Sequence, residues 1–310
     1  MIHIIGGAGF VGERLGSLLS SKQISFRSYD KSLNGEHYVD VTKPESLSSL
    51  PRADVVINLA AEHRDDVRPS SLYELVNVVG AANVCAYCRR ANIRTIVFTS
   101  SAAVYGLSPE NCDEDSPMVP FNEYGRSKMR AEAIYNEWVQ EDHQNRSLII
   151  VRPTVIFGEG NRGNVYNLLN QIARRRFLMI GKGANKKSMA YVDNVAEFLL
   201  YCINLNRGKH VFNYVDKPDL DMNSLVRLVR TILFNKNNIG LRLPSWAGSI
   251  IGYAADLLGA VSGKPLPISS VRIQKFLATT AFSSSIAKSD FEPSITLEAA
   301  LERTIRHEFL

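Results

Sequence analysis

Short apolar runs alternate with longer segments of helical periodicity in the first half of the chain. The apolar runs lie at residues 2–5, 25–29, 55–59, 95–99 and 148–151, and the helical patterns lie at residues 12–21, 71–91 and 124–142. Bare apolar strands that alternate with helices are typical of a parallel sheet with helices on both faces. We therefore predict an α/β fold built on a doubly wound parallel sheet.

The second half of the chain has a less regular pattern. Helical periodicity covers residues 165–175 and 193–204, and short helices and strands interrupted by proline follow. We predict a first domain at residues 1–155, to which residues 188–213 return. A smaller C-terminal α/β domain is predicted at residues 156–310.

Composition and charge exclude several classes of protein. Of the 310 residues, 45% are hydrophobic and 22% are charged, which is typical of a globular chain and not of a disordered or fibrous one. The net charge of +5 is spread along the chain without a basic stripe, so we expect no nucleic acid partner. No run reaches the ~18 apolar residues of a membrane span, and a strand occupies the place of a signal peptide. We therefore expect a cytoplasmic protein.

The cysteines predict neither a disulfide framework nor a metal site. Cys85 and Cys88 form a single C-x-x-C inside a helical pattern, with no second Cys or His pair at zinc-site spacing. We expect two buried helical thiols in a reducing compartment and no bound metal.

A glycine-rich turn joins the first predicted strand to the first predicted helix. Gly6, Gly9 and Gly12 form a G-x-x-G-x-x-G pattern that includes Phe10 and Val11. Glycines permit a tight turn and the close approach of a pyrophosphate, and the helix N-terminus offers its free N–H groups to the anion. The pattern predicts a Rossmann-type dinucleotide site, which makes the first domain the cofactor-binding one.

Further candidate cofactor contacts follow the next strands. Asp30 ends the second predicted strand, and a carboxylate there accepts hydrogen bonds from the adenosine ribose and repels a 2′-phosphate, which favours NAD over NADP. Arg27 and Lys31 are close enough in sequence to weaken that exclusion. The other expected contacts, to the adenine and to the dinucleotide along the sheet, are Asp40, Val41, Leu59, Ala60 and Ala61.

Tyr124 and Lys128 form a Tyr-x-x-x-Lys pattern, which on a helix places a phenol and an ammonium group on one face. A tyrosine with a pKa near ~10 is a poor base at neutral pH, and a nearby lysine favours its phenolate form. Residues 98–106 bring hydroxyl groups to the end of the fourth predicted strand, where ligands of open α/β sheets bind. Ser101 is placed there to hold a substrate hydroxyl group.

The glycine turn, the strand end at residues 98–106 and the Tyr-x-x-x-Lys pattern, in this order along the chain, resemble the extended short-chain dehydrogenase/reductase superfamily of NAD-dependent epimerases and dehydratases. The resemblance covers essentially the whole chain. It implies that Ser101, Tyr124 and Lys128 are catalytic and that Tyr124 and Lys128 also bind NAD. It also implies that Pro153 lines the nicotinamide and that Asn77 has a structural role.

Two alanines separate this chain from the dehydratases. Dehydratases of the superfamily look like Thr-Asp-Glu-Val-Tyr-Gly at the fourth strand end, whereas this chain has Ala102 and Ala103 at the acidic positions. Reversible hydride transfer needs no such acids, so we expect an epimerase. Longer strings are similar to bacterial epimerases that act on N-acetylglucosaminyl-diphospho-undecaprenol in O-antigen and lipopolysaccharide synthesis. They lie at residues 59–67, 152–159, 161–167, 187–192, 213–220 and 269–272.

This closer resemblance implies a 4-epimerase that converts GlcNAc to GalNAc on undecaprenyl diphosphate through a transient 4-keto sugar. It also implies a homodimer formed through two helices and a place at the inner face of the cytoplasmic membrane. Three alternatives stay open, namely a UDP-glucose or UDP-GlcNAc 4-epimerase, a net sugar reductase or dehydrogenase, and a dinucleotide-sensing regulator.

The substrate-binding half offers polar side chains for a sugar and its diphosphate. The candidates are Arg64, Ser101, Thr154, Arg162, Asn164, Lys187 and Arg272. For each cation alone, a solvated surface charge is the competing interpretation. Residues 243–261 carry apolar side chains at helical spacing, which fits either a helix that contacts a membrane or polyprenyl chain or a helix of the substrate-domain core.

Overall fold

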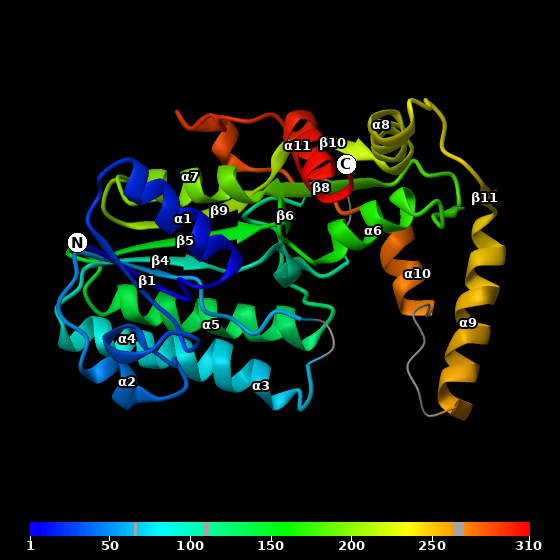
Figure 1. The fold of residues 1–310 in the computed structure, drawn as a ribbon. Coiled ribbons are helices and arrows are strands. Elements are labelled where there is room, and N and C mark those ends of the chain that lie inside the picture. Colours follow the sequence, from blue (N-terminus) through cyan, green and yellow to red (C-terminus); the bar gives the residue numbers. More distant parts are fainter. Residues whose placement is uncertain (65–66, 108–111, 263–269) are drawn as a thin grey trace.

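A computed structural model of the chain describes residues 1–64, 67–107, 112–262 and 270–310 (Figure 1). The side chains of residues 257–262, 271, 272 and 275 lie outside the description. The described part contains a central parallel sheet with helices on both faces and a smaller C-terminal part at one end of it. The predicted α/β fold is confirmed.

The central sheet has six parallel strands in the order β2-β1-β3-β4-β5-β9. Their bounds are β1 Ile2–Ile5, β2 Phe26–Tyr29, β3 Val55–Asn58, β4 Thr95–Thr99, β5 Ser147–Pro153 and β9 Lys209–Tyr214. β1 pairs with β2 on one side and β3 on the other, so Ile2 lies opposite both Phe26 and Val55. The winding direction therefore reverses between β1 and β3, and open α/β sheets bind ligands at the carboxyl edge of such a point.

Helices cover both faces of this sheet. α1 (Phe10–Ser21) packs beside α7 (Val192–Cys202) on one face, and α4 (Gly80–Arg90) packs beside α5 (Glu123–Gln140) on the other (Figure 1). The apolar faces of these helices are therefore buried against the sheet, and the strand ends stay available for a site.

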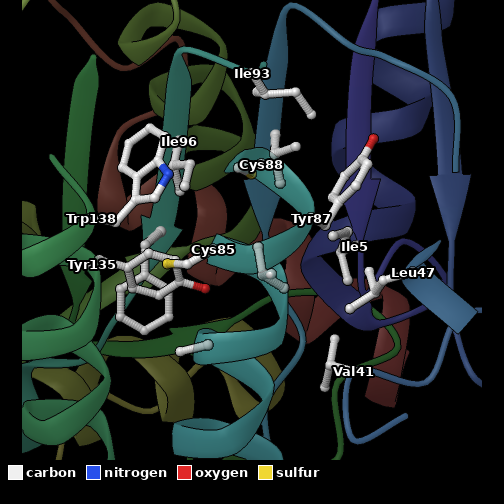
Figure 2. Close-up of a cluster of buried hydrophobic side chains, with 14 of the residues drawn as sticks. Ile5, Val41, Leu47, Cys85, Tyr87, Cys88, Ile93, Ile96, Tyr135 and Trp138 are labelled. Carbon is white, nitrogen blue, oxygen red and sulfur yellow. The ribbon is translucent and has the colours of Figure 1, made fainter. Parts of the chain in front are cut away.

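A buried apolar cluster lies between the sheet and the helices α4 and α5 (Figure 2). Cys85 and Cys88 of α4 lie in it as free, fully buried thiols, together with Tyr135 and Trp138 of α5. Burial raises the pKa of the Cys85 thiol to about 12 and keeps it protonated. The prediction of buried helical thiols is confirmed. In the described part of the chain, no three His, Cys, Asp or Glu side chains are grouped to hold a metal ion.

Short helical segments connect the elements of this first part. They are the 3-10 turns Gly35–His37 and Ala102–Tyr105, the helices α2 (Pro44–Ser48) and α3 (Ser71–Tyr73), and a π-helical segment at Glu74–Val79. The helix predicted at residues 71–91 is thus continuous but contains a π-helical turn between α3 and α4.

The C-terminal part contains two small sheets. The first has the strands β10 (Asp216–Asp221), β8 (Lys186–Tyr191) and β6 (Val155–Phe157), and the second has β11 (Arg242–Leu243) and β7 (Met179–Ile180). β5 continues into β6 after one residue, and β9 continues into β10 after one residue. Two neighbouring strands of the central sheet therefore run directly into the small sheet.

The remaining helices complete the C-terminal part. α6 (Asn164–Ala173), α8 (Met222–Phe234) and α11 (Leu297–Phe309) enclose an apolar core with β8. α9 (Ser245–Ser262) and α10 (Ser270–Leu277) pack on each other at the end of the molecule opposite the N-terminus (Figure 1). A last 3-10 turn lies at Ser285–Lys288. Among the described residues, no helix combines the length and apolar character that a membrane crossing needs.

The path of the chain bears on the predicted domains. α7 and β9 return to the central sheet, whereas β8, which includes residues 188–191, belongs to the small sheet. The division into domains at residues 1–155 and 156–310 stays a prediction.

Large apolar side chains on one side of α9 are exposed. This bears on the two interpretations of residues 243–261, a helix of the substrate-domain core or a helix that contacts a membrane or polyprenyl chain. Trp246, Ile250 and Tyr253 are 67%, 60% and 68% exposed. The core-helix interpretation is therefore wrong for this part of α9, because a core helix buries its large apolar side chains.

Candidate active site

The backbone of the glycine turn between β1 and α1 packs so closely that side chains at Gly6 and Gly12 would clash with neighbouring backbone atoms. Gly6 has φ +84°, and a Cβ atom there would lie 2.6 Å from the Ala60 nitrogen at the end of β3. A Cβ atom on Gly12 would lie 2.5 Å from the Gly6 oxygen. Gly9 caps α1 without a side-chain hydrogen bond, so the helix N-terminus presents backbone N–H groups as an anion site would.

The other residues of the turn connect the two parts of the molecule. Phe10 and Val11 begin α1 and pack, half-buried, against the apolar core of the C-terminal part. The ring of Phe10 approaches Gly158, whose added Cβ would lie 3.4 Å from it. The glycine turn therefore lies at the junction of the two parts.

Two buried hydroxyl groups at neighbouring strand ends fit a polar ligand. Thr99 ends β4 and Thr154 follows β5, and the Oγ1 atom of each is buried without a hydrogen-bond partner. Pro153, the last residue of β5, is buried and directly precedes Thr154. Together with the glycine turn, these orphaned hydroxyls fit a dinucleotide that lies along the carboxyl edge of the sheet.

Asp30 follows β2 at this edge. Its Oδ1 atom accepts hydrogen bonds from the backbone N–H and the hydroxyl of Ser32, both at 2.9 Å. These bonds fix the orientation of a half-exposed carboxylate. The position fits a ribose contact, which stays a prediction.

The remaining predicted cofactor contacts have local roles. The Oδ1 atom of Asp40 accepts hydrogen bonds from the N–H and hydroxyl of Thr42, and Val41 is buried in the apolar cluster beneath the sheet. The small-residue segment after β3 is half-buried at the carboxyl edge and consists of Leu59, Ala60 and Ala61. Its contact with Gly6 brings it to the glycine turn, and cofactor binding by these five residues stays a prediction.

The first two turns of α5 carry Tyr124 and Lys128. The helix begins after Asn122, whose Oδ1 atom accepts a hydrogen bond from the Gly125 N–H at 2.9 Å. Tyr124 is half-buried, and its ring lies 6.4 Å from the ring of Tyr73 on α3. Lys128 is buried one turn further along the helix.

Close packing joins the start of α5 to the turn that carries Ser101. An added Cβ atom on Gly125 would lie 2.4 Å from the Ala103 oxygen, so only glycine allows this approach. Ser101 caps the 3-10 turn, and its hydroxyl accepts a hydrogen bond from the Ala103 N–H at 3.1 Å. The structure therefore brings the Ser101 turn against the N-terminus of the helix that carries Tyr124 and Lys128.

Burial changes the protonation of Lys128. Its Nζ atom donates to the Thr99 carbonyl at 2.9 Å and lies 4.8 Å from the centre of the Phe98 ring. Burial lowers the pKa of Lys128 to about 7, and the nearby Glu132 carboxylate acts in the opposite direction. A small change in nearby charge therefore decides whether this lysine is cationic at neutral pH.

The sequence reasoning did not identify the buried polar network behind Lys128. Glu132 accepts hydrogen bonds from Arg152 at 2.9 and 2.7 Å and from the Ser100 hydroxyl at 2.6 Å. Arg152 also donates to the hydroxyl of Tyr105, at the end of the Ser101 turn. The spacing of Lys128 and Glu132, four residues apart on one helix face, was the available signal.

Asn77 has the structural role that the resemblance implied. Its amide donates to the Glu62 carbonyl at 2.9 Å and accepts from the Glu62 N–H at 2.8 Å. It also donates to the Ser127 hydroxyl at 2.8 Å. Asn77 therefore ties the segment after β3 to α5.

The predicted substrate cations have local partners. Arg162 forms an ion pair with Glu308 at 2.6 Å, and its guanidinium lies 4.3 Å from the centre of the Tyr166 ring. Lys187 donates to the Ala278 carbonyl at 2.5 Å, and burial lowers its pKa to about 8. A substrate diphosphate would share or replace these partners, so both roles stay predictions.

The other substrate candidates lie in different places. Arg64 is exposed and lines a hollow of about 260 Å³ together with Glu62, Val67 and Arg68. Asn164 is exposed at the first position of α6. The side chain of Arg272 lies outside the described residues.

The sequence matches a known family over most of its length. A sequence model described as the NAD dependent epimerase/dehydratase family matches residues 2–214. The chain belongs to this family. The predicted resemblance, the cofactor NAD and the epimerase class are confirmed.

Individual relatives refine this membership. The chain is 47% identical over 319 residues to the N-acetyl-alpha-D-glucosaminyl-diphospho-ditrans,octacis-undecaprenol 4-epimerase of Escherichia coli O157:H7, with 100% of this chain and 95% of the relative covered. It is 26% identical to the UDP-glucose 4-epimerase of Vibrio cholerae, with 66% of this chain and 64% of the relative covered.

Solved structures share the fold. The UDP-N-acetylglucosamine 4-epimerase of Bacillus cereus has a TM-score of 0.76 at 18% identity, with 98% of each chain covered. The UDP-glucose 4-epimerase of Thermotoga maritima, solved with UDP-glucose, also has a TM-score of 0.76, at 19% identity, with 99% of this chain and 97% of that chain covered. At these identities the likeness concerns the fold.

Proposed function

We propose that the protein is a 4-epimerase that interconverts GlcNAc and GalNAc on undecaprenyl diphosphate. The observation that carries this proposal is the 47% identity to an epimerase named for that lipid-linked sugar, which extends over the full chain. The UDP-sugar epimerases are more distant. The Vibrio cholerae enzyme matches 66% of this chain, and the Bacillus cereus enzyme is similar in fold at 18% identity.

The proposed mechanism assigns the acid–base chemistry to Tyr124. NAD, when bound at the glycine turn, would supply a reversible hydride acceptor for C4 of the sugar. Tyr124, as phenolate, removes the proton of the 4-hydroxyl group and later returns a proton to the oxygen at C4. Ser101 holds that oxygen by a hydrogen bond. Reduction from the other face of the 4-keto sugar would invert C4 without net oxidation.

Lys128 supports the phenolate electrostatically. Lowering the pKa of a tyrosine from ~10 to ~7 requires roughly 4 kcal/mol of differential stabilisation. A buried ammonium group one helical turn from Tyr124 is suited to supply part of it, because its field is weakly screened. The negative phenolate in turn favours the charged form of Lys128.

We also propose that the protein works as a homodimer at the inner face of the cytoplasmic membrane. Leu75 and Val79 of the π-helical segment are 42% and 40% exposed, beside the helices α4 and α5 on which it packs. Two exposed apolar side chains four residues apart on one helical segment suit a helix-to-helix interface. A lipid-linked substrate places the reaction at a membrane surface.

A paired assay tests the proposed substrate. Purified protein receives either GlcNAc-diphospho-undecaprenol in detergent or UDP-GlcNAc, without added reductant, and both reactions are analysed for the 4-epimer. We expect product from the lipid-linked sugar alone. Product from UDP-GlcNAc at a comparable rate would overturn the substrate assignment and leave the mechanism intact.

The Tyr124→Phe variant tests the mechanism in the same assay. We expect activity to fall by ~10²-fold or more, because the variant lacks the acid–base group, while NAD still binds. Tyr38→Phe, a change in a tyrosine near β2, is the matched control and should keep its activity. Near-normal turnover by Tyr124→Phe would contradict the assignment of the base.

A further inference from the structure

Helix α9 has one side shaped for close packing. An added Cβ atom on Gly248 would lie 2.4 Å from the Ile180 side chain of β7, and one on Gly252 would lie 2.9 Å from both Ile273 and Ser270 of α10. The two glycines are four residues apart and therefore share one face of the helix. This glycine face joins α9 to the rest of the molecule.

The opposite side of α9 carries large apolar side chains in contact with solvent. Trp246, Ile250 and Tyr253 are spaced four and three residues apart, so they form one stripe, here called the outer face. All three are at least 60% exposed, and Trp246 and Tyr253 are each more than two-thirds exposed. Figure 1 shows α9 standing at the edge of the molecule with α10 on one side only.

The outer face lacks negative charge. Asp256 is the single acidic residue of α9, and its carboxylate faces the Ser270 N–H at the start of α10, at 3.2 and 3.3 Å. Residues 222–262 otherwise carry cations only: Arg227, Arg230, Lys236 and Arg242. Lys236 and Arg242 are exposed in the segment that leads into α9.

We propose that the outer face of α9 binds the surface of an anionic lipid bilayer, with the helix lying in the interfacial plane. Apolar and aromatic side chains on one face, with cations nearby, are the features of helices that bind in this way. Trp and Tyr suit the headgroup region because each has an apolar ring and a polar group. This inference rests on the proposed function, because a lipid-linked substrate is located at the bilayer surface.

A second copy of the chain fits the outer face less well. The two aromatic residues and the isoleucine expose on the order of 400 Å² together, given ~150–250 Å² for a whole aromatic side chain. A stable protein interface needs about 800 Å² from each partner. The nearby cations would also repel their counterparts across a two-fold interface, whereas they attract anionic headgroups.

The two tryptophans of the chain provide a direct test. Trp138 is fully buried in α5, whereas Trp246 lies on the outer face. Iodide should therefore quench Trp246 in the free protein. We expect vesicles of phosphatidylcholine with phosphatidylglycerol, without any substrate, to protect Trp246 from iodide and shift its emission to the blue. Unchanged quenching with vesicles in excess would overturn the proposal.

Two substitutions distinguish vesicle binding by the outer face from non-specific binding by any exposed apolar side chain. Ile250→Ser should weaken sedimentation with these vesicles by about tenfold, because it removes one apolar anchor. Leu310→Ser, at a C-terminal leucine that is 71% exposed, is the matched control and should change nothing. An equal loss of vesicle binding in Ile250→Ser and Leu310→Ser would contradict binding through the outer face.

A second pair of variants tests the contribution of the cations near α9 to vesicle binding. Lys236→Gln with Arg242→Gln should weaken vesicle binding, and most strongly at low salt. Lys22→Gln with Arg52→Gln removes two exposed cations from the N-terminal part and serves as the control. Equal binding to vesicles of phosphatidylcholine alone would contradict the role of anionic lipid.

Activity on a water-soluble substrate keeps this test independent of the proposed function. GlcNAc-diphosphate on a short prenyl chain should be epimerised equally by the wild type and by Ile250→Ser. Vesicle binding without activity on this substrate would overturn the function but not the docking face. A loss of dimer in Ile250→Ser would assign the face to a second copy and overturn the docking proposal.

Discussion

Lys128 and Glu132 are buried one turn apart on α5, and each is tied to a different strand of the central sheet. Lys128 donates to the Thr99 carbonyl of β4, and Glu132 is paired with Arg152 of β5 at 2.7 Å. The proposed catalytic helix is therefore fixed to two strand ends by polar contacts that water does not reach. Two of the following predictions concern these residues, and two concern the glycine turn and β1.

Glu132→Gln should destabilise the protein and shift its pH profile. The change leaves the Arg152 guanidinium buried without its carboxylate, which typically costs about 3–5 kcal/mol. It also removes the group that raises the pKa of Lys128, so that pKa should fall below about 7. Urea unfolding and the pH dependence of activity would measure both effects. Glu137→Gln, on the exposed side of α5, is the control.

A purely structural role for Glu132 predicts lower stability with an unchanged pH profile. The double variant Glu132→Gln with Arg152→Met removes the unpaired guanidinium and should recover part of the stability. A normal pH profile in the single variant Glu132→Gln would contradict an electrostatic influence on Lys128.

Lys128→Met should stabilise the fold at pH 6 while abolishing activity. The folded-state pKa of Lys128 is about 7, against an ordinary value of 10.5, so the unfolded chain binds more protons between these values. The stability of the wild type therefore rises with pH from about 7 to 10, and the penalty for the buried charge is fully present below pH 7. We expect a gain of about 2–4 kcal/mol at pH 6 that disappears near pH 10. A gain that is independent of pH would contradict this explanation.

Two glycine substitutions should separate folding from cofactor binding. Gly12→Ala places a methyl group 2.5 Å from the Gly6 oxygen and should lower the free energy of unfolding by about 1–3 kcal/mol. Gly9 has φ −81°, and its added Cβ would meet the same oxygen at 3.3 Å, so Gly9→Ala should fold nearly normally. If the turn approaches a pyrophosphate, Gly9→Ala should still weaken NAD binding in calorimetry. Unchanged NAD affinity in Gly9→Ala would contradict that approach.

His3 should make the protein sensitive to mild acid. The side chain is fully buried in β1 with its Nδ1 atom 2.8 Å from the Tyr87 hydroxyl, and burial lowers its pKa from 6.5 to about 4. The unfolded chain binds more protons between these values, so stability should fall by up to about 3 kcal/mol as the pH drops from 6.5 to 4. Thermal unfolding across this range should show a flatter dependence for His3→Gln than for the exposed-site control His143→Gln.

The sequence predicted those parts of the site that depend on local spacing. The glycine turn follows β1 directly, and Tyr124 and Lys128 share a helix face because they are four residues apart. The order of strands and helices in the first half was predictable for the same reason, since each element has its own apolar period.

Contacts between distant segments could not be predicted in this way. Arg152 and Glu132 belong to a strand and a helix, and only the packed sheet brings them together. The pairing of Arg162 with Glu308, which are 146 residues apart, gave the sequence analysis no signal either. Apolar residues at helical spacing look the same in a core and on a surface, so the exposure of Trp246 required the structure.

The direct continuation of β5 into β6, and of β9 into β10, limits how the two parts of the molecule can move. Neighbouring strands cross from one part to the other side by side, and β8 lies between their continuations. A hinge at this place would have to bend two hydrogen-bonded strands at once, so we expect the frame around the proposed site to be rigid. With such a frame, the proposed mechanism requires the sugar itself to turn between its oxidation and its reduction.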